Sequence, residues 1–189
     1  HAVHTWMFGQ LPIDQIFECI KRIGFCADLS ISPSGASSPE NIIEFLEKNN
    51  MRGMGRIPVC TAMFTGEEQN LSDCDIMVRR NCISFVKRCV RTTAYVGSDR
   101  LLISPSGISL TNKYSRSRKA DWEMAIESLY EIGVYAQRYG VKLMIEPINR
   151  YRVALVHTVK EALSMVEEIG LENIGVVPDV FHMCMEEVS

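Results

Sequence analysis

Short apolar runs alternate along this chain with longer segments in which apolar residues recur at helical spacing. Runs of roughly four to eight apolar residues favour buried strands, and apolar residues three and four positions apart favour helices with one buried face. The pattern predicts six strands, ending with one that stops at Glu146 and one that stops near Asp179; the earlier four lie near 2–8, 27–31, 55–64 and 100–104.

Helix-period segments separate these strands, and several carry recognisable end signals. Ser38 followed by Pro39 is a helix cap followed by a proline in the first turn, and Gly140 is typical of a helix end. The predicted helices cover 13–23, 38–49, 73–96, 120–139 and 158–169, and a sixth is expected to start at Glu186. Repeated β–α units with almost no hairpin signals indicate a parallel sheet covered by helices, either doubly wound or a (β/α) barrel.

Two carboxylates follow predicted strands. Glu146 comes directly after Lys142-Leu-Met-Ile, and Asp179 comes shortly after Ile174-Gly-Val-Val, with the helix segment 158–169 between them. A right-handed crossover makes the two strands parallel, so both acids leave the sheet at its carboxyl edge. Neighbouring strands lie roughly 4.8 Å apart, which lets two acids share one cation. The sequence therefore predicts a metal-dependent enzyme.

The same residues favour a barrel over a doubly wound sheet. Functional residues at several strand ends are typical of barrels, whose active sites lie on that face, and no GxGxxG follows the first strand. A complete barrel has eight units and about 250 residues, whereas this pattern holds only six units. We therefore expect residues 1–189 to form one partial barrel domain.

Composition is that of an ordinary globular domain: 47% hydrophobic, 23% charged and a net charge of −3. No apolar run approaches the ~20 residues of a membrane span, and the basic stretch 113–119 is too short to argue for nucleic acid. The N-terminal residues do not resemble a signal peptide, and seven cysteines without a CxxC pair favour reduced thiols. The expected location is cytoplasmic.

The two motifs also carry a family resemblance. Glu146-Pro-Ile-Asn-Arg-Tyr151 and Asp179-Val-Phe-His-Met183 resemble the xylose-isomerase-like TIM barrels, and most closely the sugar phosphate isomerase/epimerase group that includes the ketose 3-epimerases. The resemblance implies a (β/α)8 barrel of which about six units are present. It also implies a divalent cofactor, Mn²⁺ before Mg²⁺ or Co²⁺, held by Glu146 and Asp179. Two further ligands, a His and a Glu on strands seven and eight, have no counterpart in these residues.

The implied reaction moves a proton next to a sugar carbonyl. The resemblance makes Glu146 one of two proton-transfer groups around an enediolate, which a bound cation stabilises. It makes His182 a contact to a substrate oxygen rather than a metal ligand, and it turns His4 on the first strand toward the sugar. The expected partner is therefore a small sugar or keto-sugar.

Arg152 departs from the family pattern, because epimerases commonly carry Glu at this position. Arginine only donates hydrogen bonds, so it suits a phosphate, a carboxylate or a keto-sugar better than a plain hydroxyl. A metal-dependent lyase acting on 3-keto-sugars, including C-glycosides, is therefore an alternative. A further alternative is a non-catalytic, incomplete barrel that needs another chain, and open sheet edges favour a homo-oligomer. Ordinary structural roles stay open for His4 and Arg152, and Arg150 is expected to form a salt bridge at the rim.

Overall fold

The computed structural model describes residues 2–9, 11–24, 26–49, 57–66, 68–108 and 117–187. Within them six strands form one sheet in the order β1-β2-β3-β4-β5-β6, and every neighbouring pair is parallel. The strands are β1 Ala2–His4, β2 Cys26–Ile31, β3 Val59–Ala62, β4 Arg100–Ile103, β5 Lys142–Ile145 and β6 Ile174–Val176.

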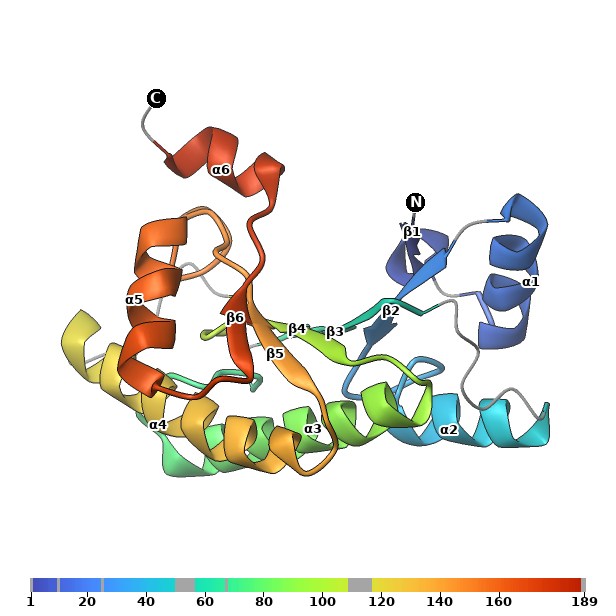
Figure 1. Cartoon of the computed structure of the whole chain (residues 1–189), viewed down its shortest axis with the longest axis horizontal. Coiled ribbons are helices and arrows are strands. Elements are labelled where there is room, and N and C mark those ends of the chain that lie inside the picture. The colour runs from blue at the N-terminus through green and yellow to red at the C-terminus, as the bar shows by residue number, and fades with distance from the viewer. Residues whose placement is uncertain are drawn as a thin grey trace.

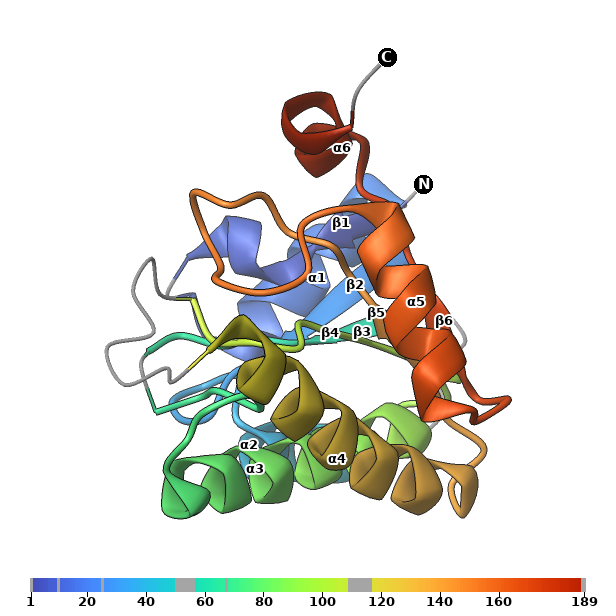
Figure 2. The same cartoon turned by 90° about the vertical axis from the view of Figure 1, so that its left-hand side faces the viewer.

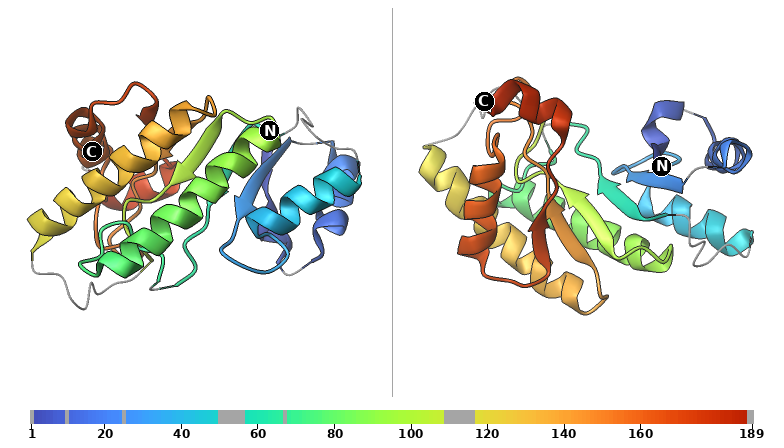
Figure 3. Two further views of the ribbon diagram at one scale, coloured as in Figure 1. Left: turned by 90° about the horizontal axis from the view of Figure 1, so that it is seen from below. Right: turned by 45° about the horizontal axis from the view of Figure 1, so that its top comes forward.

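Helices alternate with these strands along the chain. They are η1 Thr5–Phe8, α1 Ile13–Ile23, α2 Pro39–Lys48, α3 Ile76–Tyr95, α4 Arg118–Gln137, α5 Val159–Ile169 and α6 Val180–Glu186. Figures 1 and 2 show α2, α3 and α4 beneath the sheet, with α6 on the opposite side beyond the end of β6. From below, α3 and α4 lie side by side across the sheet (Figure 3, left).

The strand order decides between the two folds that the sequence pattern allowed. A doubly wound sheet reverses its strand order at a switch point, whereas a barrel adds each strand beside the previous one. The observed order is consecutive from β1 to β6 without a reversal. The prediction of a partial (β/α) barrel is therefore confirmed, with six strands of the eight in a full barrel.

Side-chain alternation along the strands separates the core from the barrel interior. Leu143 and Ile145 of β5 are fully buried against the helix layer, as are Leu29 and Ile31 of β2. Because successive strand residues point to opposite faces, the residues between them point to the inner face. Glu146 is the first residue after β5 and follows Ile145, so the same alternation directs its side chain toward the interior of the barrel.

Three predicted element boundaries need correction. The first strand stops at His4 and continues as the 3-10 helix η1, where a strand was expected over 2–8. The sixth helix does not start at Glu186 but ends there, because Asp179 caps its start by accepting a hydrogen bond from Phe181 N at 2.8 Å. The third strand is shorter than expected, and residues 55–56 of that prediction, like most of the basic stretch 113–119, lie outside the described residues.

The Ser38 signal was accurate, because its side chain accepts a hydrogen bond from Asn41 N and Pro39 begins α2. The segment expected to be helical over 158–169 forms α5, where Thr158 and Glu161 form a reciprocal capping box and Gly170 ends the helix in a left-handed conformation. No helix in the described part of the chain is long and apolar enough to span a membrane.

Candidate active site

Two acidic residues converge at the carboxyl edge of β5 and β6. Glu146 follows β5 directly, and its backbone N–H donates to the carbonyl of Ile103 in β4 at 3.1 Å, which fixes the backbone at the rim. Asp179 lies three residues past the end of β6 and begins α6. Ligand atoms of Glu146, Asp179 and His182 all lie within 4.8 Å of one another. The structure therefore brings together the two acids that the sequence paired, and it adds His182 to them.

The electrostatics of this cluster favour a cation. Burial raises the pKa of Glu146, and the negative charges of Asp179 and Asp28 add to this effect, so that the pKa is about 7. Among the described residues, neither Glu146 nor Asp179 forms an ion pair with a lysine or arginine. Two carboxylates without a cationic partner form a donor pair that suits a hard or borderline divalent ion. The residues present therefore fit a divalent cation.

His182 is held by Asn149 in one orientation. The Asn149 side chain is buried, and its Oδ1 accepts a hydrogen bond from Tyr151 N at 3.1 Å, which leaves its Nδ2 facing the imidazole Nδ1 at 2.8 Å. We assign the neutral tautomer with the proton on Nε2, because Nδ1 must accept from this amide. Burial lowers the pKa of His182, and the charge of Arg152 lowers it as well. A neutral imidazole with Nε2–H is suited to donate to a sugar oxygen.

Arg150 fastens α6 to the rim, and its predicted structural role is confirmed. Its guanidinium contacts both carboxylate oxygens of Glu186, with the shortest contact at 2.7 Å, and its backbone N–H donates to the same group at 2.7 Å. The Glu186 side chain is completely buried, and these hydrogen bonds lower its pKa. The pair anchors the C-terminal end of α6, the short helix that begins at Asp179 and carries His182, to the loop after β5.

Arg152 lies on the surface beside this cluster. Its side chain is exposed, and its backbone N–H donates to the carbonyl of Asn149 at 2.9 Å. Burial is the main cause of the lowered pKa of His182; the positive charge of Arg152 adds to it, and the negative charge of Asp179 opposes it. A role in substrate binding stays a prediction.

His4 sits at the opposite side of the sheet, at the end of β1. Its Nδ1 lies 3.0 Å from Oδ2 of Asp28, although the contact is not aligned as a hydrogen bond. Asp28 is almost fully buried in β2 and accepts a hydrogen bond from Thr61 Oγ1 at 3.0 Å. Burial raises the pKa of Asp28, and the neighbouring imidazole and the Thr61 hydroxyl oppose this. The sequence prediction missed Asp28, although an acid inside the apolar run 27–31 was a usable signal.

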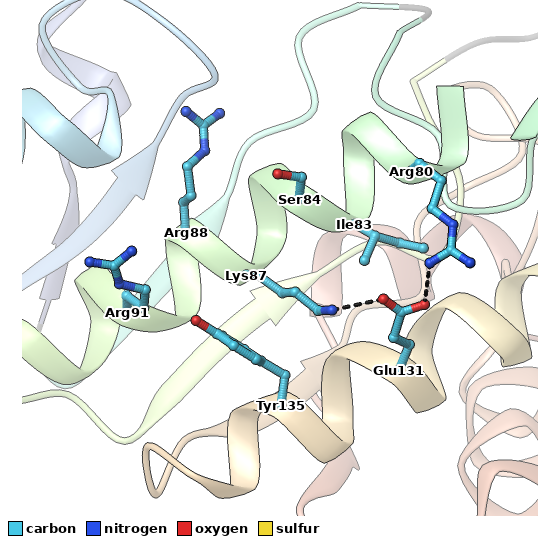
Figure 4. Close-up of a pocket in the computed structure, with 8 residues that line it drawn as sticks. All are labelled: Arg80, Ile83, Ser84, Lys87, Arg88, Arg91, Glu131 and Tyr135. Atoms are coloured by element: carbon cyan, nitrogen blue, oxygen red, sulfur yellow. Dashed lines mark hydrogen bonds and ion pairs between the residues drawn. The ribbon is translucent and has the colours of Figure 1, made fainter. Parts of the chain in front are cut away.

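A second group of charged residues lies on the outside of the barrel, between α3 and α4 (Figure 4). Arg80 and Lys87 of α3 both reach Glu131 of α4, at 2.8 and 2.7 Å, and Arg88 pairs with Glu40 at 3.0 Å. Arg80 and Lys87 share one carboxylate, Arg88 has its own, and all three lie under the sheet, away from its carboxyl edge. The acidic cluster on the rim is therefore the stronger candidate for chemistry.

Consecutive parallel strands covered by helices define the class of (β/α) TIM barrels, of which the described residues form six units. Within that class, residues 17–188 match the family model described as "Xylose isomerase-like TIM barrel". The chain belongs to this family, as the two motifs had indicated.

Relatives in the family include several sugar epimerases. The chain is 32% identical over 126 residues to a D-psicose 3-epimerase of Ruminiclostridium cellulolyticum, a match that covers 65% of this chain and 42% of that protein. It is 26% identical over 114 residues to a 3-dehydro-D-guloside 4-epimerase of Escherichia coli, covering 58% and 44%.

Solved structures agree on the fold. A D-psicose 3-epimerase with D-tagatose from Clostridium cellulolyticum H10 superposes with a TM-score of 0.81 at 24% identity, over 100% of this chain and 66% of that one. The matches therefore span less than half of the relatives by sequence and about two thirds by structure.

Proposed function

We propose that this chain carries the strand-five and strand-six part of a divalent-metal-dependent sugar isomerase or epimerase. The observation that carries the proposal is the convergence of Glu146, Asp179 and His182 within 4.8 Å at the carboxyl edge of the sheet. The sugar epimerases among the relatives support the reaction class.

Glu146 is the proposed base. Burial raises the pKa of the metal-free Glu146 carboxyl to about 7, and a bound divalent ion would keep this group ionised and able to accept a proton. In that state it can take a proton from the carbon beside a sugar carbonyl and return it later. Removal of this proton produces an enediolate, whose negative charge needs a hydrogen-bond donor.

His182 is the proposed donor. Asn149 holds its Nδ1 at 2.8 Å, so Nε2–H is the free donor of the ring. This arrangement favours a contact to a substrate oxygen, as the sequence predicted, over a direct bond to the metal. Arg150 and Glu186 maintain the position of the ring because they fasten α6 to the loop after β5.

Glu146 and Asp179 would hold the divalent ion, and their carboxylate oxygens suit Mn²⁺, which we propose first, as well as Mg²⁺ or Co²⁺. A bound ion would supply Lewis-acid stabilisation of the charge that develops on the sugar oxygens. The second proton-transfer group of an epimerase would come from outside the six strands of this sheet, either from further strands or from another copy of the chain. The edges at β1 and β6 make homo-oligomer formation a proposal as well.

A keto-sugar lyase is the second candidate. Arg152 lies near His182 and offers donors only, which suits a carbonyl-rich keto-sugar. The 4-epimerase of Escherichia coli named above also acts on a dehydro-sugar, by its name. Incubation with a panel of ketoses and a panel of 3-keto-glycosides separates epimerisation from elimination by the products formed.

Calorimetric titration with Mn²⁺ tests the metal site itself. We expect binding that Glu146→Gln weakens by at least about tenfold, since removing one of few ligands has an effect of this order. Glu172→Gln, which changes an exposed carboxylate, is the matched control and should bind like the unmodified chain. Equal Mn²⁺ affinity in all three proteins would refute the ligand assignment.

A further inference from the structure

Helix α3 differs in charge from the rest of the chain. Its 20 residues include five basic side chains and neither aspartate nor glutamate, whereas the whole chain has a net charge of −3. Four of the basic residues, Arg80, Lys87, Arg88 and Arg91, recur at helical spacing and line a pocket of about 320 Å³ between α3 and α4 (Figure 4). The positive charge of α3 is therefore concentrated in one groove on the outside of the barrel.

Two carboxylates contact three of these cations. Glu131 of α4 accepts hydrogen bonds from Arg80 Nη1 at 2.8 Å and from Lys87 Nζ at 2.7 Å, and it is the only acidic side chain among the described residues that line the pocket. Glu40 of α2 accepts a hydrogen bond from Arg88 Nη1 at 3.0 Å. Three cations thus share two negative charges, and one positive charge of this group is left over.

Arg91 adds a second uncompensated charge. Its side chain is exposed and forms no ion pair with any residue that the structure describes. It follows Arg88 by three positions and Lys87 by four, and like charges at this helical spacing repel. Arg88 contacts Glu40 through Nη1 alone, and its buried Nε has no hydrogen-bond partner in the described part of the chain. An anion seated beside these side chains would remove the repulsion and accept hydrogen bonds from their remaining N–H groups.

Lys87 is held in place before any ligand arrives. Its side chain is 28% exposed, its Nζ is bonded to Glu131, and the same Nζ lies 5.3 Å from the ring centroid of Tyr135. A cation held by two neighbours gives up little conformational freedom when it contacts a ligand. Ser84, one turn before Arg88, adds an exposed hydroxyl that can donate to the same ligand. The groove thus offers positioned donors as well as charge.

The spacing of the cations indicates the size of the anion. At a rise of about 1.5 Å per residue, Lys87, Arg88 and Arg91 lie within about 6 Å of one another along the helix axis. Guanidinium groups match phosphate oxygens with two parallel N–H donors, and two linked phosphate groups have enough oxygens to contact all three cations. The pocket volume of about 320 Å³ lies within the range of small-molecule sites, roughly 300–1,000 Å³. A small molecule with linked phosphate groups therefore fits better than a single inorganic ion or a folded partner.

We propose that the groove between α3 and α4 binds a small molecule that carries two linked phosphate groups, held by Lys87, Arg88 and Arg91. The groove lies under the sheet, away from the carboxyl edge that carries Glu146 and Asp179, so this site does not depend on the proposed function.

Calorimetric titration of the metal-free chain tests the site, with inorganic pyrophosphate as the probe and orthophosphate at the same ionic strength as the comparison. We expect pyrophosphate to bind about fivefold or more tightly, because its two groups contact more cations. Arg91→Gln should weaken pyrophosphate binding about fivefold, since one exposed cation is lost. Glu131→Gln should strengthen it about twofold or more, because a negative charge leaves the groove, and damage to the fold does not produce an increase in affinity.

Arg22→Gln, which removes one exposed charge from α1, is the matched control, and Arg152→Gln tests whether the probe binds at the rim instead. Both variants should bind pyrophosphate like the unmodified chain. Equal affinity for the two probes, or equal pyrophosphate affinity in Arg91→Gln and Arg22→Gln, would overturn the proposal. Binding of hexaglutamate without binding of pyrophosphate would assign the groove to an acidic protein segment and would overturn it too. Because the titration contains neither Mn²⁺ nor a sugar, such a result would leave the proposed function standing.

Discussion

Replacing Glu146 with glutamine should stabilise the metal-free protein at alkaline pH while removing its metal site. The carboxyl has an ordinary pKa of 4.5, and burial, reinforced by Asp179 and Asp28, raises it to about 7 in the folded chain. An acid whose pKa is raised by folding binds its proton more tightly in the folded state. Stability from this group is therefore greatest below pH 4.5 and falls as the pH rises toward 7.

The loss of stability on ionisation of Glu146 follows from the difference between its ordinary pKa of 4.5 and its pKa of about 7 in the folded chain. Each pKa unit corresponds to about 1.36 kcal/mol, so full ionisation of a raised acid of this kind destabilises the fold by roughly 3 kcal/mol as an upper bound. Glu146 is only partly buried, and solvent screening reduces the figure to about 1–3 kcal/mol. Glutamine has nearly the same shape and does not ionise. The variant should therefore gain about 1–3 kcal/mol over the unmodified chain at pH 8 but little at pH 5.

Urea unfolding followed by circular dichroism, at pH 5 and pH 8 with a chelator, measures the difference directly. The exposed Glu172→Gln variant should track the unmodified protein at both pH values. Added Mn²⁺ should raise the stability of the unmodified chain and not that of Glu146→Gln. A stability difference between Glu146→Gln and the unmodified chain that is the same at both pH values would show that Glu146 is not an uncompensated buried acid, and the reasoning would fail.

Three further outcomes follow from the site. Arg150→Met leaves the buried carboxylate of Glu186 without its guanidinium partner and should lower the midpoint of thermal unfolding, and Glu186→Gln in the same protein should recover part of the loss. Asp28→Asn removes a negative charge that acts on Glu146, so a carbon-13 NMR titration should find the Glu146 pKa below about 7; an unchanged titration would contradict the coupling. Asp179→Asn should abolish Mn²⁺ binding yet keep α6 folded, because asparagine caps a helix as well as aspartate; loss of the α6 amide signals would count against this.

Much of the fold was predictable because it depends on local patterns. Apolar runs and helical spacing located the strands and helices, and Ser38 followed by Pro39 marked the start of α2 correctly. The two wrong boundaries have local causes that the apolar pattern does not record. The segment after His4 turns into a 3-10 helix, and the Asp179 side chain starts α6 earlier than the apolar pattern indicated.

The amino-acid sequence by itself determined that Glu146 and Asp179 meet, since parallel strands joined by a right-handed crossover place their carboxyl ends on one edge. Only the tertiary structure decided which residues support them. Asp28 meets His4, and Glu186 meets Arg150, across 24 and 36 positions of the chain. Such pairs depend on which elements pack together and on how deeply each side chain is buried, and no local pattern records either property. The consecutive strand order, which separates a barrel from a doubly wound sheet, is long-range for the same reason.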